Sequence, residues 1–515
     1  MAALLGWLFD GFEMGMFPLV GQKAIAELLP DQSAVARTEW FGVIMAVFLV
    51  GAATGGVLFG WLGDRLGRVR AMALSIFTYA IFTGLCGFAT QAWHIAAFRF
   101  IASLGMGGEW ALGVALVTEM WPDKSRALMA GLIGAAANVG YLVVGLISLV
   151  LLGIIEWFGQ TLISLGMSPE LVAKLVSGDG WRLMMIIGAL PAIIMFFIMR
   201  IVPESHKWEE ERDKGATSHW ATRDLLGVLI GAIGALGVIF IWSPVFRSMF
   251  VASTGDAQAS LGGVVNGVRA VLTVVGVAAA LIGFMYPVVR YMTRAEQAGV
   301  LGPGDRRRCV NRLIFGSCLA GVALLGTWGS LQWAPKWSIA LSANKPLAKE
   351  YTQISMATGA ILGTLIAALM GGWIGRRVTY ALLCVGSFIS LVYMYLANDT
   401  FGPKFLMSAF AAGGITAAFY GWFPLYFPEL FPTSIRATSQ GFAFNFGRVL
   451  SAIGSLQTAT LTAFFSRNVP KERIEIDAFS KAGATLAAIY LVGVFIIWLG
   501  PETKGEPLPE SMRDI

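Results

Sequence analysis

EMWPDKSRALMAG at residues 119–131 and ELFPTSIRATSQG at residues 429–441 are two copies of one pattern, E-x-x-P-x-x-x-R-A-x-x-x-G, set 310 residues apart. Two further pairs of motifs recur at similar offsets: GWLGDRLGR at 60–68 with GWIGRR at 372–377, and PESHK at 203–207 with PETKG at 501–505. Three ordered repeats indicate that the chain contains two copies of one unit.

The composition is that of a chain that lies in lipid. Of 515 residues, 57% are hydrophobic and only 13% are charged, whereas soluble domains carry about 25% charged residues. Apolar runs long enough to cross a bilayer, about 18 residues or more, recur along the chain. Charge clusters lie between these runs, so the net charge of +6 does not indicate a nucleic-acid partner.

We predict an all-α membrane protein with fourteen spans, since a closed barrel would need short alternating strands. The spans lie near residues 2–21, 41–62, 71–90, 92–120, 127–155, 181–202, 225–243, 270–292, 311–334, 352–372, 379–397, 404–427, 439–465 and 482–500. The apolar segment 157–176 is interrupted at Ser168-Pro169, which predicts an amphipathic excursion outside the membrane.

The repeats divide the chain into three parts. Residues 1–203 form a first unit of six spans, and residues 306–515 form a second unit of six spans with a short tail. Residues 204–305 hold a polar linker and two inserted spans, which return the chain to the same side of the membrane. Two parallel six-helix bundles are typical of secondary transporters that rock about a central site.

Lysine and arginine counts predict the orientation. Loops on the side of Asp64, Arg126 and Arg436 hold 21 of these residues, and loops on the other side hold 14. Because positive residues are retained in the cytosol, that side and both termini are expected to be cytosolic. The expected location is a cell membrane, the inner membrane if the source is bacterial. The chain begins almost inside its first span, so a longer cytosolic N-terminus is left open.

These motifs resemble those of the major facilitator superfamily across nearly the whole chain outside 204–305. GWLGDRLGR at 60–68 is similar to the superfamily's signature between its second and third helices. Other motifs resemble particular branches: PES at 203–205 and PETKG at 501–505 are similar to motifs of sugar porters. Arg99 with GMGGEW at 105–110 resembles the fourth helix of metabolite:proton symporters. DGFE at 10–13 is similar to the D-G-x-D of aromatic-acid and sialic-acid symporters. The resemblance implies a two-bundle fold and transport by alternating access.

Asp10, Glu13 and Glu109 are acidic residues within predicted spans. Asp10 and Glu13 are three residues apart and share a helix face. A charged carboxylate at the bilayer centre costs at least about 2.5–3.5 kcal/mol, and neighbouring carboxylates in a dry site raise each other's proton affinity. We predict that at least one of them couples transport to protons, Asp10 first. The alternative is a protonated acid that only bonds a neighbouring helix.

Arg99 and Arg448 are cations in the interior of predicted spans, away from the span ends. Arg99 lies ten residues from Glu109, about 15 Å along the helix and roughly 80° around it. It therefore needs another anion, either a carboxylate on the first helix or the substrate. Arg448 could hold a substrate carboxylate through two parallel hydrogen bonds. Alternatively, it could pair with Asp10 or Glu13 across the interface between the units.

Polar and aromatic residues in neighbouring spans could complete a solute site. The candidates are Asn138, Tyr141, Trp328, Gln332, Tyr420, Trp422, Asn445 and Gln457. Tryptophan and tyrosine are also common at membrane interfaces, so a purely structural role is the alternative for each.

The loop motifs predict gates on the cytosolic side. The candidate gating residues are Asp64, Arg65, Arg68, Glu119, Arg126, Glu429 and Arg436. Ion pairs among such residues can lock one state of a transporter and release in the other. A signal for membrane topology alone is the alternative. The second copy, at 372–377, lacks the acid of the first, so the two gates are predicted to be unequal.

The sequence thus predicts a secondary active transporter that takes up a small organic solute with protons. An organic anion, sialic acid or another carboxylate, is favoured because Arg99 and Arg448 offer buried positive charge. The alternatives are a neutral sugar porter and a solute sensor with a transporter fold. No enzyme activity, cofactor or metal is expected, since neither G-x-x-x-x-G-K-[ST] nor H-E-x-x-H occurs. The protein is expected to be a monomer, and coupling to sodium is left open.

Overall fold

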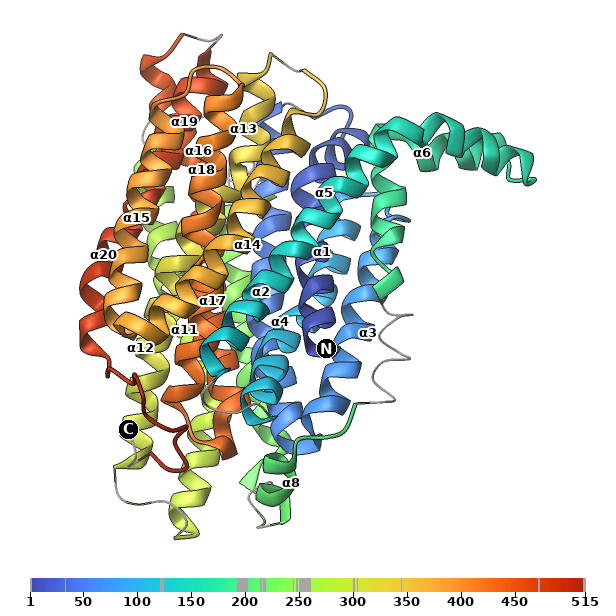
Figure 1. Ribbon diagram of the computed structural model, residues 1–515. Coiled ribbons are helices and arrows are strands. Elements are labelled where there is room, and N and C mark those ends of the chain that lie inside the picture. Colours follow the sequence, from blue (N-terminus) through green and yellow to red (C-terminus); the bar gives the residue numbers. More distant parts are fainter. Residues whose placement is uncertain are drawn as a thin grey trace.

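The computed structural model is a bundle of long helices that lie side by side (Figure 1). It describes residues 2–32, 34–120, 125–191, 202–213, 215, 219–243, 245–246, 249, 261–299, 302, 304–343, 345–470 and 473–512. Every regular element in these ranges is a helix, so the predicted all-helical class is confirmed. We call the end that carries α8 (His206–Asp213) the inner end, and the end that carries α13 (Ala334–Leu341) the outer end.

The helices follow the order that the repeats predict. The first unit contains α1 Ala2–Leu28, α2 Ala34–Leu66, α3 Arg68–Cys86, α4 Ala92–Met120, α5 Arg126–Ser164 and α6 Pro169–Ile187. The insertion contains α8, the 3₁₀ turn Thr222–Asp224, α9 Leu225–Trp242 and α11 Leu261–Gln297.

The second unit begins at α12 Asp305–Gly329. Its further α-helices are α13, α14 Ala348–Ile374, α15 Arg376–Leu396, α16 Pro403–Ala417, α17 Phe419–Tyr426, α18 Arg436–Phe465, α19 Phe479–Ala487 and α20 Ile489–Ile496. Short 3₁₀ turns lie at Leu331–Trp333, Phe427–Leu430, Thr433–Ile435, Ser466–Asn468 and Ile497–Leu499, and a π-helical turn lies at Ile474–Ala478.

Eleven helical segments in the described ranges are long and apolar enough to cross a membrane. The predicted spans 2–21 and 439–465 are not among them, although both are helical. They correspond to α1, which carries Asp10 and Glu13, and to α18, which carries Arg448 and several other polar residues. The predicted span 181–202 runs into residues 192–201, outside the described ranges. The total of fourteen therefore stays a prediction.

Two helix seams join the first unit to the second: α2 packs against α18, and α5 packs against α14. Within the first unit, α2 also packs closely on α4. A side chain at Gly55 would meet the Leu104 carbonyl oxygen at 1.8 Å, and one at Gly107 would meet the Ala52 carbonyl oxygen at 1.9 Å. Small residues of this kind let helix backbones approach each other where lipid gives no hydrophobic drive. These contacts hold α4 and its acid in register with α2.

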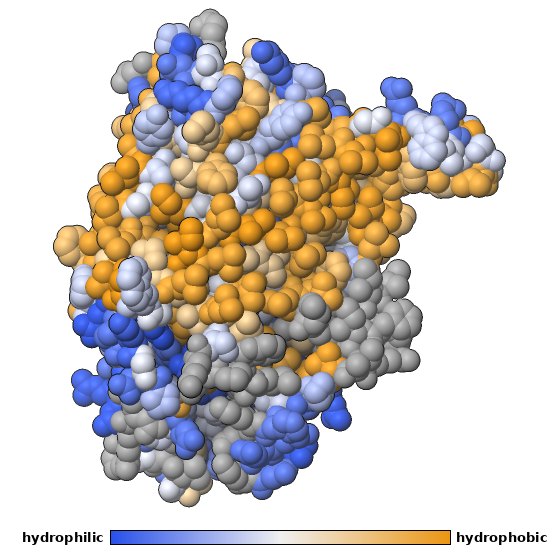
Figure 2. Space-filling model, viewed as in Figure 1, coloured by the Kyte–Doolittle hydropathy of each residue, from blue (hydrophilic) through white to orange (hydrophobic). Residues whose placement is uncertain are grey.

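The end of α5 and the start of α6 form an arm that projects sideways from the outer end (Figure 1). The predicted boundary between span 127–155 and the excursion 157–176 is wrong, because α5 continues to Ser164 without a break. Its 39 residues extend about 58 Å, roughly twice the thickness of a hydrocarbon core. Figure 2 shows hydrophobic atoms on the lower side of the arm and hydrophilic atoms above, which agrees with an amphipathic excursion.

The inserted helices lie along the seam between the units. α9 and α11 pack against each other; α9 also contacts α2 and α18, and α11 contacts α12 and α18. Arg65 Nη1 donates to Thr222 Oγ1 at 2.8 Å, which ties the insertion to α2. The predicted gating residue Arg65 thus faces the insertion, because its position on α2 points it away from the contact with α18.

Candidate functional site

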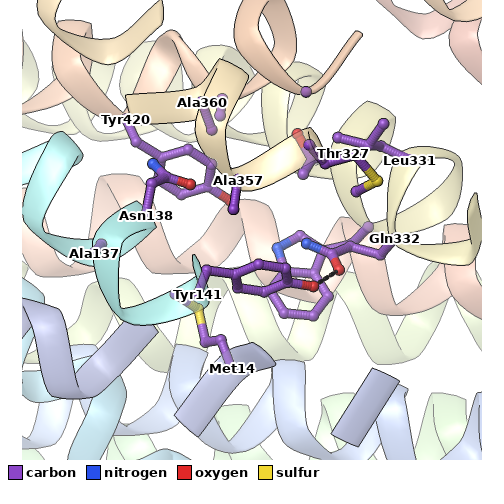
Figure 3. Close-up of a pocket in the computed structure, with 14 residues that line it drawn as sticks. Met14, Ala137, Asn138, Tyr141, Thr327, Leu331, Gln332, Ala357, Ala360 and Tyr420 are labelled. Carbon is purple, nitrogen blue, oxygen red and sulfur yellow. Dashed lines mark hydrogen bonds between the residues drawn. The ribbon is translucent and has the colours of Figure 1, made fainter. Parts of the chain in front are cut away.

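A small cavity of about 50 Å³ lies between the two units (Figure 3). We call it the central cavity. Its polar lining comes from Asn138, Tyr141, Thr327, Gln332 and Tyr420. Its other lining residues are Met14, Ala137, Trp328, Leu331, Met356, Ala357, Ala360, Gly413 and Ala417. An apolar pocket with a few convergent polar groups is the usual form of a small-molecule site.

Five of the predicted solute-binding residues meet at this cavity: Asn138, Tyr141, Trp328, Gln332 and Tyr420. Tyr141 of α5 donates its hydroxyl hydrogen to Gln332 Oε1, as Figure 3 shows, and this bond joins the first unit to the second. Asn138 Nδ2 donates to the Gly134 carbonyl at 2.8 Å, one turn earlier on its own helix.

Asp10 of α1 and Glu109 of α4 lie close enough for their carboxyl groups to act on each other electrostatically. Both side chains are buried, at 3% and 1% exposure. Both Glu109 oxygens and Asp10 Oδ1 lack an N–H or O–H donor among the described residues. Since an ionised carboxylate only accepts, two carboxyl groups can bond each other only when one carries a proton. A hydrogen bond between these two acids would therefore hold a proton between α1 and α4.

The sequence predicts proton coupling for Glu13 as well, but the structure pairs this residue with Arg99. Arg99 Nη1 lies 3.1 Å from Glu13 Oε1, and both side chains are 1% exposed. Thr83 Oγ1 donates to the same oxygen at 3.2 Å. The Arg99 guanidinium also lies over the Phe17 and Phe48 rings, at 4.9 and 4.4 Å. Of the two anions considered for Arg99, the structure supplies the carboxylate on α1.

Arg448 of α18 is buried, at 3% exposure, and its Nε and Nη1 have no hydrogen-bond partner among the described residues. Its guanidinium carbon lies 5.3 Å from the centre of the Phe444 ring. Asp10, Glu13 and Tyr420 act on its charge electrostatically without forming an ion pair with it. Tyr420 also lines the central cavity, whereas Arg448 itself is not among the lining residues; its guanidinium lies near Tyr420 with unbonded donors.

Three predicted solute-binding residues lie elsewhere. Trp422 donates its indole N–H to the Arg376 carbonyl at 3.0 Å, near the inner end. It is two residues from Tyr420, about 200° around a helix, so the two cannot face one cavity. Asn445 Nδ2 donates to the Gly107 carbonyl at 3.1 Å and ties α18 to α4. Gln457 is partly buried but does not line the central cavity.

Two polar residues that the sequence did not single out lie close to these groups. Gln353 of α14 is fully buried and donates to the Gly15 carbonyl at 3.3 Å and to the Tyr141 carbonyl at 3.2 Å. Tyr79 of α3 is also fully buried, its hydroxyl lacks a partner among the described residues, and the three candidate acids act on it electrostatically. Each is a single polar residue in an apolar run, a signal too weak to find from sequence.

At the inner end, Asp64 joins α2 to the first turn of α18. Its carboxylate forms an ion pair with Arg68 and accepts from both the hydroxyl and the backbone N–H of Thr438, the latter at 2.9 Å. Arg68 Nη2 also reaches the Thr433 carbonyl at 3.5 Å. A carboxylate at a helix N-terminus meets unsatisfied N–H groups and the positive end of the helix dipole. This contact bridges the two units, as a gate requires.

Glu429 makes the second bridge at the inner end. It accepts from Arg126 Nη1 of the first unit at 3.0 Å, and from Arg376 Nε and Nη2 of the second unit at 3.0 and 2.7 Å. The Thr503 hydroxyl also donates to it. The second copy of the loop motif lacks an acid, so Arg376 takes its partner from the other repeated motif. We call the Asp64 and Glu429 contacts together the inner latch.

The repeated PES and PETKG motifs cap two helices. Glu204 accepts from the backbone N–H of Arg68 at 2.8 Å and of Val69 at 3.1 Å, at the start of α3. Glu502 does the same at the start of α15, with Arg376 at 2.9 Å and Arg377 at 3.1 Å. The residues just before these helices are Gly67 and Gly375, whose φ angles of 113° and 104° suit glycine.

The two remaining gating candidates have other surroundings. Arg436 Nε donates to the Phe431 carbonyl at 3.2 Å and its Nη2 to the Pro509 carbonyl at 3.2 Å, so it holds the C-terminal segment within the second unit. The Glu119 side chain lies outside the described residues.

Glu429→Gln is expected to loosen the inner latch, because it leaves Arg126 and Arg376 buried without an anion. Breaking such a buried pair costs about 3–5 kcal/mol. A cysteine placed at Ala137 in the central cavity should then react faster with a membrane-impermeant thiol reagent added from the inner side. Glu210→Gln, at an exposed position of α8, is the control. Equal reaction rates in the two variants would contradict a gating role for Glu429.

The chain is similar in sequence to known transporters. A family model described as "Sugar (and other) transporter" matches residues 1–225. The chain is 24% identical over 510 residues to the niacin transporter NiaP of Acinetobacter baylyi, covering 98% of this chain and 93% of that protein. It is 24% identical over 412 residues to the cis,cis-muconate transport protein of the same organism, covering 80% and 76%.

The fold is also similar to that of a solved transporter. The structure of the major facilitator superfamily proton:xylose symporter XylE from E. coli matches with a TM-score of 0.62 at 18% identity, over 99% of this chain and 97% of that one. At this identity the likeness concerns the fold alone. The family model over residues 1–225, the relatives that span the chain and the solved structure all describe transporters, so this multi-pass chain resembles the transporters of small organic solutes in the major facilitator superfamily.

Proposed function

We propose that this protein takes up a small organic anion together with protons. The observation that carries the proposal is the Arg448 guanidinium, which is buried near Tyr420 of the cavity lining with Nε and Nη1 unbonded. A planar guanidinium binds a carboxylate through two parallel N–H···O bonds. Buried donors without a partner are costly, so an anionic solute that reaches this guanidinium would gain bonds that the described residues do not supply.

Charge balance at the site links the anion to a proton. Glu13 and Arg99 neutralise each other in their ion pair. We further propose that Asp10 and Glu109 share one proton in the resting state, so that the two acids carry a single negative charge that Arg448 balances electrostatically. A second proton on the acid pair would leave the Arg448 charge uncompensated and available to a solute carboxylate. Anion and proton binding would thereby favour each other, which is the thermodynamic basis of symport.

Alternating access is proposed to come from the two units, 1–203 and 306–515, rocking about the central cavity. The inner latch closes one side of this pathway through bonds that cross between the units. Residues 204–305 are proposed to form an added linker and helix pair outside the transport pathway. The proposed setting is a cell membrane with both termini in the cytosol, and the proposed functional unit is a monomer.

A neutral sugar is the second candidate substrate. The family model described as "Sugar (and other) transporter" and the XylE-like fold favour it. The unbonded guanidinium of Arg448 favours an anion instead, as do relatives named for niacin and muconate, which are carboxylates. Sialic acid remains within the proposed class because it also carries a carboxylate.

A thermal-shift screen of the purified protein tests the substrate class, because a bound solute stabilises the folded state by mass action. Aromatic acids, sialic acids and short carboxylates should raise the unfolding temperature, whereas hexoses should not. In proteoliposomes, an inward proton gradient should then drive uptake of the carboxylate that raises the unfolding temperature. Stabilisation by hexoses alone would overturn the anion proposal, and uptake indifferent to the proton gradient would overturn symport.

A further inference from the structure

The outer end contains a second and larger cavity, of about 780 Å³, which we call the outer vestibule. It lies between α1 and α5 of the first unit and α13 and α14 of the second. None of its lining residues lines the central cavity. Along α14, Gln353 comes between Glu350 of the vestibule lining and Met356 of the central cavity lining, and it bonds the carbonyls of Gly15 and Tyr141 from the first unit. A solute from the outer side therefore meets the vestibule before the central cavity.

The vestibule is rich in cations. Four lysines from four different segments line it: Lys23, Lys336, Lys345 and Lys349. Two carboxylates, those of Asp179 and Glu350, also line it. Because the described lining holds four positive and two negative side chains, the cavity has an excess of positive charge and attracts anions.

Both vestibule carboxylates are already engaged. Asp179 lies 3.5 Å from the Lys23 ammonium and 3.6 Å from the Lys349 ammonium. Lys349 also donates to the Leu19 carbonyl at 3.0 Å and lies 3.6 Å from Glu350, whose Oε1 accepts from Ser148 at 3.3 Å. The negative charges of the vestibule are thus shared around Lys23 and Lys349 and leave the other two lysines uncompensated.

Lys336 and Lys345 form no ion pair with any described residue. The Lys336 ammonium donates to the neutral Thr38 hydroxyl at 3.1 Å and lies 5.5 Å from the Trp333 ring centre. Glu475 acts on it only at longer range. Lys345 is exposed. An ammonium group held in a partly enclosed cavity without a carboxylate offers a bond to an incoming anion.

We propose that the outer vestibule is an external binding site for organic carboxylates, with Lys336 and Lys345 supplying the charge that captures them. This proposal rests on the proposed uptake of an organic anion, and it adds a binding step in the vestibule before the solute reaches the central cavity. The vestibule raises the local concentration of the anion beside Gln353, and so it governs capture from dilute solution. Arg448, further in, governs the binding that precedes translocation.

The test is the double variant Lys336→Gln/Lys345→Gln in proteoliposomes, with a carboxylate that the unmodified protein transports. Charge steering raises association rates by roughly 10- to 1,000-fold and fades with salt. At low ionic strength the KM for uptake should therefore rise at least about fivefold, with kcat little changed. The salt dependence of KM seen in the unmodified protein should also disappear.

The matched control is Lys174→Gln/Lys404→Gln, which removes two lysines outside the vestibule lining. It changes the net charge equally and should leave KM and its salt dependence unaltered. Thermal stabilisation of the vestibule variant by saturating carboxylate checks that it folds and keeps its central site. If KM and its salt dependence match those of the control, the vestibule site is wrong while the anion proposal stands. If the unmodified protein neither binds nor transports carboxylates, both fall.

Discussion

Arg448→Lys is expected to weaken carboxylate uptake by about 10- to 100-fold, because a hydrogen bond to a charged group contributes about 1.5–3 kcal/mol and each 1.4 kcal/mol is tenfold. Lysine keeps the positive charge but replaces the planar fork with a point charge, so the second parallel bond is lost. Arg448 Nε and Nη1 bond no described residue, so little internal bonding is removed. Initial uptake rates against carboxylate concentration in proteoliposomes measure the effect as a rise in KM.

Arg269→Lys is the matched control for this experiment. Arg269 is also buried within a helix of the insertion, and its guanidinium lies 5.3 Å from the Trp242 ring centre, outside the central cavity lining. Its replacement should leave KM unchanged. An unaltered carboxylate KM in Arg448→Lys would remove Arg448 from the solute site. Loss of hexose uptake in that variant would instead support the sugar-porter alternative.

Asp10→Asn is expected to abolish accumulation driven by an inward proton gradient while leaving solute exchange across the membrane intact. The asparagine amide has nearly the size of the carboxyl group and can donate a hydrogen bond to Glu109, so the contact between α1 and α4 should survive. The amide cannot release a proton, so the empty transporter can no longer lose its proton before it reorients. Accumulation under an imposed gradient and exchange of labelled for unlabelled solute at equilibrium are the two measurements.

Asp305→Asn is the control for the coupling experiment. Asp305 is a buried carboxylate that accepts from the Gly302 N–H at 2.9 Å, at the start of α12 and away from the acid pair. It should retain accumulation driven by the gradient. Accumulation retained by Asp10→Asn would exclude Asp10 as the coupling group. If exchange disappeared along with accumulation, the role of Asp10 would be structural.

The repeated motifs predict which residues take part in the inner latch, but not which residues they bond. Asp64, Arg126 and Glu429 were recognisable because their motifs recur, and a recurring motif must occupy equivalent positions in both units. Their bonding partners were not recognisable. Glu429 joins Arg126 to Arg376 because α5, α15 and the turn after α17 meet at one point, and no spacing along the chain encodes that meeting.

The sequence alone determined the helical class, the two units and the polar side chains buried in lipid, because the cost of exposing backbone and charge to hydrocarbon acts on each span separately. Only the tertiary structure decided which charges pair. Arg99 lies beside Glu13, Asp10 and Glu109 act on each other electrostatically, and Arg448 keeps unbonded donors near Tyr420. Helix spacing specifies which residues share a face of one helix, whereas these partners come from separate helices. Their distances are set by how closely the glycine-rich backbones pack.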